Sequence, residues 1–118
     1  MKDNIIQHKS YEFALRSVAL YKKMISENKE YVLSKQFLKS STSIGANIEE
    51  TIGAQSDKDF LSKMSIAYKD ARETHYWLRL LKDTHYIGEN DAIEMLSLCD
   101  EIFRIIGKIQ IAMKNRNS

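Results

Sequence analysis

Hydrophobic residues recur at spacings of three and four along almost the whole chain, which is the period of one face of an α-helix. The pattern is interrupted at three places: around Asn28–Glu30, at Gly53–Asp57 and at Thr84–Asn90. Four amphipathic helices with short connections pack most simply as an antiparallel up-down-up-down bundle. We therefore predict an all-α fold in which residues 1–118 form a single four-helix-bundle domain.

The first predicted helix begins near Ser10, whose hydroxyl can cap the first turn. The stripe that we expect to face the core comprises Tyr11, Ala14, Leu15, Val18, Tyr21 and Ile25. A second apolar stripe lies about 120° away, at 100° per residue, and comprises Phe13, Leu20 and Met24. One bundle core does not require both stripes. The second is predicted to contact another copy of the chain, or else it simply widens the core face.

The second predicted helix contains a run of small and polar residues, SSTSIGANIEE, from Ser40 to Glu50. Gly45 inside this helix costs about 1 kcal/mol relative to alanine, so we expect close packing to compensate. The third helix is predicted to follow a cap at Ser56 and to be about 27 residues long, at roughly 40 Å. Its paired alanines, Ala67 and Ala71, are the expected partners of the small-residue run.

Further apolar residues lie beside the core stripes of the last two predicted helices. In the third helix these are Ile66, Trp77 and Leu80. We predict that they too contribute to self-association. Cys99 lies on the apolar stripe of the fourth helix, where a free cysteine usually acts as a small hydrophobic residue.

Composition supports these helices and limits the class of protein. Hydrophobic residues make up 43% of the chain, proline is absent and there are only four glycines, so few helix breakers are present. The single cysteine, the lack of a signal-peptide pattern and the lack of a long apolar stretch predict a cytoplasmic protein without a membrane partner.

The polar residues of the small-residue run are the first candidates for chemistry. Ser43, Asn47 and Glu50 could form a polar site at a helix contact, or hydrogen bonds that fix helix register. His75 with Glu50 is a weaker candidate for acid–base catalysis, because no nucleophile pattern accompanies it. A di-iron bundle requires glutamates that precede a histidine by three residues. This chain has no such pair. We therefore expect no catalytic residues, no metal and no cofactor.

Basic residues near both ends of the chain are the candidates for binding RNA or DNA. In a four-helix bundle both termini lie at the same end, so these side chains could share one basic surface. The residues expected to share that end are Lys9, Arg16, Lys108, Lys114 and Arg116, and the further basic candidates on the same two helices are Lys22, Lys23 and Arg104. The alternative is that they are solvated charges that offset the helix dipoles. A net charge of only +2 does not by itself indicate a nucleic-acid-binding protein.

Four segments resemble one bacterial family over nearly the whole chain. They are SYEFAL from Ser10, SKQFLKSSTSIGANIEE from Ser34, SDKDFLSKMSIAYKDARE from Ser56 and HYWLRLL from His75. The sequence is similar to the 23S rRNA-intervening sequence proteins, also called S23 ribosomal proteins. The resemblance implies a four-helix bundle that assembles as a homopentamer. The family also includes the accessory protein of diversity-generating retroelements, which binds nucleic acid and a reverse transcriptase. The resemblance therefore implies these two kinds of partner for this chain.

Together these observations predict a non-enzymatic oligomeric scaffold that binds nucleic acid, a protein partner such as a reverse transcriptase, or both. One alternative is a regulatory, antitoxin-like subunit whose second apolar stripes cover a different protein. The other is a hydrolytic or nucleic-acid-processing enzyme that uses Glu50 and His75.

Overall fold

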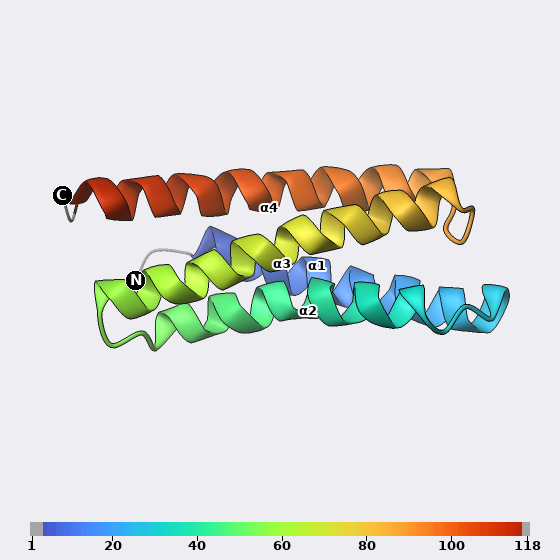
Figure 1. Ribbon diagram of the computed structural model, residues 1–118, viewed down its shortest axis with the longest axis horizontal. Helices are drawn as coiled ribbons and strands as arrows, with labels where there is room; N and C mark the ends of the chain where they lie inside the picture. Colours follow the sequence, from blue (N-terminus) through green and yellow to red (C-terminus); the bar gives the residue numbers. More distant parts are fainter. Residues whose placement is uncertain (1–3, 117–118) are drawn as a thin grey trace.

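The computed structural model describes residues 4–116, and the outermost residues of the predicted domain, 1–3 and 117–118, lie outside that range. Its helices are α1 (Ile5–Lys23), which continues as the π-helix η1 (Met24–Asn28), α2 (Leu33–Ile52), α3 (Asp57–Asp83) and α4 (Glu89–Arg116). Successive helices run in opposite directions, and the start of α1 and the end of α4 lie at the same end of the bundle (Figure 1). The predicted all-α arrangement of four helices is confirmed, and the described residues contain no strand.

The first helix begins earlier than predicted. The Asn4 side chain caps it, because its Oδ1 accepts a hydrogen bond from the Gln7 amide at 3.0 Å and thereby satisfies a free donor of the first turn. The predicted cap, Ser10, is instead buried within the helix, where its hydroxyl donates to the Gln7 carbonyl at 3.2 Å.

The two apolar stripes of α1 are the reverse of the sequence prediction. Phe13, Leu20 and Met24, predicted to contact another copy, are buried in the core at 1%, 7% and 1% exposure. Tyr11 and Leu15, predicted to be core, are 63% and 52% exposed. Val18 is also exposed, whereas Ala14, Tyr21 and Ile25 are half-buried. The prediction that Phe13, Leu20 and Met24 form an oligomer interface is therefore wrong.

The physical reason for the reversal is that the core stripe of α1 contains two serines. Ser10 and Ser17 lie on the buried face between its large apolar residues. The Ser17 hydroxyl donates to the Phe13 carbonyl of its own helix at 2.8 Å, so it is buried without an unpaired polar group. A core face that carries serines looks less hydrophobic in sequence than the uninterrupted outer stripe.

Glu30 lies in the connection between η1 and α2, and its side chain caps the start of α2. Its carboxylate accepts hydrogen bonds from the amides of Val32, Leu33 and Ser34 at 3.0, 3.0 and 2.6 Å. Burial acts to raise the pKa of Glu30, but these hydrogen bonds outweigh it and hold the pKa below its ordinary value. The turn itself is completed by Lys29, whose φ of 54° is left-handed.

The close approach at Gly45 involves a different helix from the one predicted. A Cβ atom at this position would lie 3.4 Å from the backbone oxygen of Ser10, so Gly45 faces α1 and not the alanines of α3. Ala67 and Ala71 are fully buried, and the Cys99 thiol of α4 lies 3.3 Å from the Ala71 carbonyl oxygen. Burial, with a smaller contribution from the nearby Asp100 charge, raises the pKa of Cys99 to about 12, so the thiol stays protonated and acts as a small core side chain.

Candidate functional site

A groove of about 460 Å³ lies between α3 and α4, and we call it the arginine groove. Its lining residues are Tyr68, Arg72, His75 and Arg79 from α3 and Asp100, Phe103 and Arg104 from α4. The four α3 residues are spaced by four, three and four, which places them on one face of the helix. The groove therefore results from one helical face of α3 meeting the neighbouring side of α4.

The arginine groove contains three of the five arginines in the chain. The other two are ion-paired: Arg16 with Glu94, and Arg116 with Asp57 at 2.9 Å. Within the described residues, the three groove arginines form no ion pair. Their guanidinium groups remain open to a ligand, and a guanidinium matches the geometry of a phosphate or carboxylate with two parallel hydrogen bonds.

Aromatic rings hold two of these arginines in place. The Arg72 guanidinium lies over the Phe103 ring at 5.7 Å, and the Arg79 guanidinium lies 6.0 Å from the centre of the Tyr76 ring. Tyr68 also packs edge-on against Phe103, with ring centres 5.6 Å apart. Such cation–π contacts orient a guanidinium without neutralising its charge. The groove is consequently both cationic and aromatic.

His75 and Asp100 form a contact across the groove, with Nε2 and Oδ1 3.3 Å apart. The imidazole also packs against Phe103, with ring centres 5.8 Å apart. Because Asp100 is the single carboxylate among the lining residues, three arginines outweigh it and the lining is positively charged.

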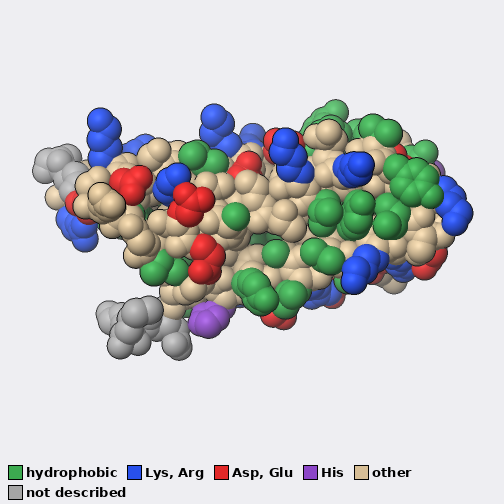
Figure 2. All heavy atoms as spheres, turned by 90° about the horizontal axis from the view of Figure 1, so that it is seen from below, with side chains coloured by type: hydrophobic (Ala, Val, Ile, Leu, Met, Phe, Trp, Pro, Cys, Tyr) green, Lys and Arg blue, Asp and Glu red, His purple; other side chains and the backbone are tan. Residues whose placement is uncertain are grey.

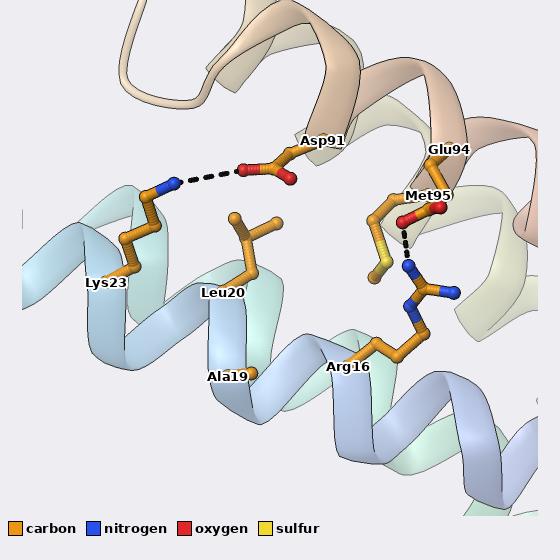
Figure 3. A pocket seen from close by; sticks show the side chains of 7 residues that line it. All are labelled: Arg16, Ala19, Leu20, Lys23, Asp91, Glu94 and Met95. Carbon is orange, nitrogen blue, oxygen red and sulfur yellow. Dashed lines mark hydrogen bonds and ion pairs between the residues drawn. The ribbon is translucent and has the colours of Figure 1, made fainter.

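The α1–α4 interface has the opposite character, because each cation that lines it is matched by an acid. A cavity of about 230 Å³ lies there. Figure 3 shows Leu20 and Met95 between the two ion pairs that line it. In one of them Lys23 Nζ lies 3.3 Å from Asp91 Oδ2, and in the other Arg16 contacts Glu94. Within each pair the positive and negative charges cancel, so the cavity has no net charge that would attract an anion.

The five basic residues predicted to share one end of the bundle do not line the arginine groove, whereas Arg104, a further basic candidate from the sequence, does. Lys9 is paired with Glu101 at 3.0 Å, and Arg16 and Arg116 are paired as described above. Lys108 and Lys114 are exposed on α4. Three of the five predicted residues are therefore engaged in ion pairs within the chain.

The polar residues of the small-residue run join α2 to α3. Asp70 Oδ2 accepts hydrogen bonds from the Ser43 hydroxyl at 2.7 Å and from the Asn47 amide at 3.1 Å. Glu50 forms an ion pair with Lys63 at 2.8 Å. These bonds connect specific positions on two helices, which is the geometry expected of residues that fix helix register. Asp70, the shared acceptor, was not identified from the sequence.

The outer face of α3 carries the remaining predicted contact residues. Ile66 is 40% exposed, whereas Trp77 and Leu80 are half-buried. The Trp77 indole donates a hydrogen bond to Glu73 at 2.9 Å. These three residues are thus available at the surface, unlike the stripe of α1 that contains Phe13.

Sequence reasoning missed Arg72 and Arg79 as binding residues, although the signal was present. They are seven residues apart, with His75 between them on the same helical face. An arginine pair at this spacing beside aromatic residues is a sign of a binding face. That Phe103 and Arg104 also line the groove could not be predicted in this way, because it depends on how α4 packs against α3.

None of the helices in the described structure is both long and apolar enough to cross a bilayer. Between residues 4 and 116, no three His, Cys, Asp or Glu side chains cluster as ligands for a metal ion.

Comparison with known proteins identifies the family. The chain is similar to a structure from Bacteroides thetaiotaomicron, described as a protein of unknown function from the S23 ribosomal protein family. The two sequences are 48% identical, the match covers 89% of this chain and 97% of the other, and the TM-score is 0.87. No curated protein matches the chain. The 23S rRNA-intervening sequence protein family matches residues 2–108, and the chain therefore belongs to this family.

Proposed function

We propose that this protein is a non-enzymatic nucleic-acid-binding protein that works as a homo-oligomer and contacts nucleic acid through the arginine groove. The observation that supports this best is the gathering of three unpaired arginines in one aromatic-lined groove. The phosphate backbone supplies most of the affinity when a protein binds nucleic acid. The family name refers to an intervening sequence of 23S rRNA, so RNA is the first ligand to test.

Binding is a better interpretation of the groove than catalysis. Its one imidazole is held by Asp100, and its lining residues include no serine, threonine, cysteine or lysine that could act as a nucleophile beside it. The enzyme alternative paired His75 with Glu50. Glu50 is engaged with Lys63 and does not line the groove, so the structure does not support that pairing.

The experiment that tests the proposal measures the affinity for a fluorescein-labelled RNA by anisotropy at several salt concentrations. We expect wild-type binding to weaken steeply with salt, because each phosphate contact releases a counterion. The triple variant Arg72→Gln, Arg79→Gln, Arg104→Gln should bind roughly 100-fold more weakly at about 0.1 M salt, with a salt slope lower by about 2. Absence of wild-type binding even at low salt would remove the proposal.

A charge-matched control separates the groove from net charge. The variant Lys9→Gln, Arg16→Gln, Arg116→Gln loses the same three charges, but from side chains that are ion-paired. Exposed ion pairs contribute little to stability, so this variant should fold. We expect it to lose less than about 10-fold in affinity, since its freed acids add only diffuse repulsion. Equal losses in the two variants would show that the groove is not the binding site.

Self-association is proposed through the outer face of α1. Tyr11, Leu15 and Val18 are exposed there, and hydrophobic side chains gather on the side of the bundle formed by α1 and α2 (Figure 2). Exposed apolar patches of this kind mark contact surfaces. The pentamer that the family resemblance implies is the expected assembly. The same face is what a regulatory subunit would use to cover a different protein.

A further inference from the structure

We infer that the arginine groove takes an unpaired nucleotide of a single strand, and not the outside of a duplex. This inference rests on the proposed function and specifies its ligand. It depends on three features of the groove: its concave shape, its aromatic floor and the spacing of its cations along α3. Each of them favours a flexible strand whose bases are accessible.

The shape of the groove is the first feature. It is a space of about 460 Å³ between two helices, with cationic side chains from both. A duplex presents its phosphates on a convex outer surface and keeps its bases stacked inside. Its backbone would meet the rim of the groove, whereas a single strand can place a sugar, phosphate and base within it.

The aromatic floor is the second feature. Phe103 lies in the groove lining, partly exposed, beneath the Arg72 guanidinium and beside the His75 ring. Unpaired bases stack on aromatic rings and on guanidinium planes, and bases within a duplex cannot. The neighbouring Tyr76 ring is 49% exposed and lies beside Arg79. Two aromatic rings, Phe103 in the groove lining and Tyr76 beside it, therefore each lie next to a guanidinium that could bind the adjoining phosphate.

The third feature is the spacing of the cations along α3. Arg72 and Arg79 are seven residues apart, which is about 10 Å along the helix axis. Arg104 of α4 follows directly after Phe103, so the cations lie on both sides of the groove. A strand that follows the groove can thus contact more than one phosphate. Because stacking and phosphate contacts do not read base edges, we expect little sequence preference.

The test compares an unstructured 20-nucleotide RNA with the same RNA annealed to its complement, by anisotropy at one salt concentration. We expect the wild-type protein to bind the single strand at least about 10-fold more tightly. Phe103→Leu, which removes the ring but keeps an apolar side chain, should weaken single-strand binding roughly 5- to 100-fold and leave duplex binding nearly unchanged. Tyr76→Leu, whose ring is exposed and not needed for the core, is a second variant in case Phe103→Leu fails to fold.

The outcomes separate this inference from the proposed function. If the duplex binds as tightly as the single strand, or if the aromatic substitutions weaken both equally, the single-strand inference is wrong while nucleic-acid binding stands. If neither RNA binds at low salt, both proposals fail. Tyr31→Leu, which removes an exposed ring outside both the groove lining and the outer stripe of α1, serves as the control and should change neither affinity.

Discussion

Phe13→Ala should destabilise the protein by about 3–5 kcal/mol, whereas Leu15→Ala should change the free energy of unfolding by less than about 0.5 kcal/mol. Phe13 is 1% exposed in the core and Leu15 is 52% exposed on the outer stripe of α1. Removing the buried ring loses its transfer free energy and leaves a cavity. Removing the exposed side chain does neither. Because the two residues are neighbours on one helix, effects on helix propensity are nearly matched.

Urea unfolding followed by the fluorescence of Trp77, the single tryptophan, measures both variants. Self-association would add a contribution that depends on protein concentration, so the comparison should be extrapolated to low concentration. A large loss for Leu15→Ala with a small loss for Phe13→Ala would restore the assignment made from the sequence. It would also mean that α1 is rotated by about 120° from its position in the bundle.

Replacing the outer stripe of α1 should convert the proposed homo-oligomer into a monomer without unfolding it. The variant Tyr11→Ser, Leu15→Ser, Val18→Ser removes exposed apolar area that a partner subunit would cover, and it leaves the core side chains in place. Each buried apolar side chain contributes about 1.5–3 kcal/mol to an interface, so three substitutions exceed what most assemblies tolerate. Light scattering should change from a multiple of 13.7 kDa to 13.7 kDa itself.

A matched control comes from α4. Ile93 and Ile111 are 56% and 61% exposed, and serine at both positions should leave the assembly intact. If this control dissociates the oligomer and the α1 variant does not, the interface lies on α4. A wild-type protein that is a strict monomer at micromolar concentration contradicts self-association. Specific co-purification with a different protein through the α1 face would then favour the regulatory-subunit alternative.

The helix pattern could be predicted from the sequence because periodicity and turn residues are local signals. The predicted breaks at Asn28–Glu30, Gly53–Asp57 and Thr84–Asn90 each overlap a connection between helices, with boundaries that differ by one or two residues. The rotation of α1 could not be predicted in the same way. Its core face contains Ser17, whose hydroxyl is satisfied within the helix, and the competing stripe is the more hydrophobic of the two. Only the packing against α2 and α4 distinguishes them.

The candidate site was harder to predict because charge pairing depends on three-dimensional structure. Lys9 and Arg16 look as basic in sequence as Arg72 does, yet their partners Glu101 and Glu94 lie on a helix far along the chain. A net charge of +2 conceals this difference. What distinguishes the groove is which cations remain unpaired, and that follows from how α3 and α4 are aligned.

The most direct test of the account is an NMR titration that observes the arginine side chains. The chain has five arginines, so ¹⁵N-labelled protein gives five Nε–Hε signals that single substitutions can assign. On addition of single-stranded RNA, the account predicts that the signals of Arg72, Arg79 and Arg104 shift and that those of the ion-paired Arg16 and Arg116 stay in place. Shifts at Arg16 and Arg116 with the three groove signals unchanged would contradict it.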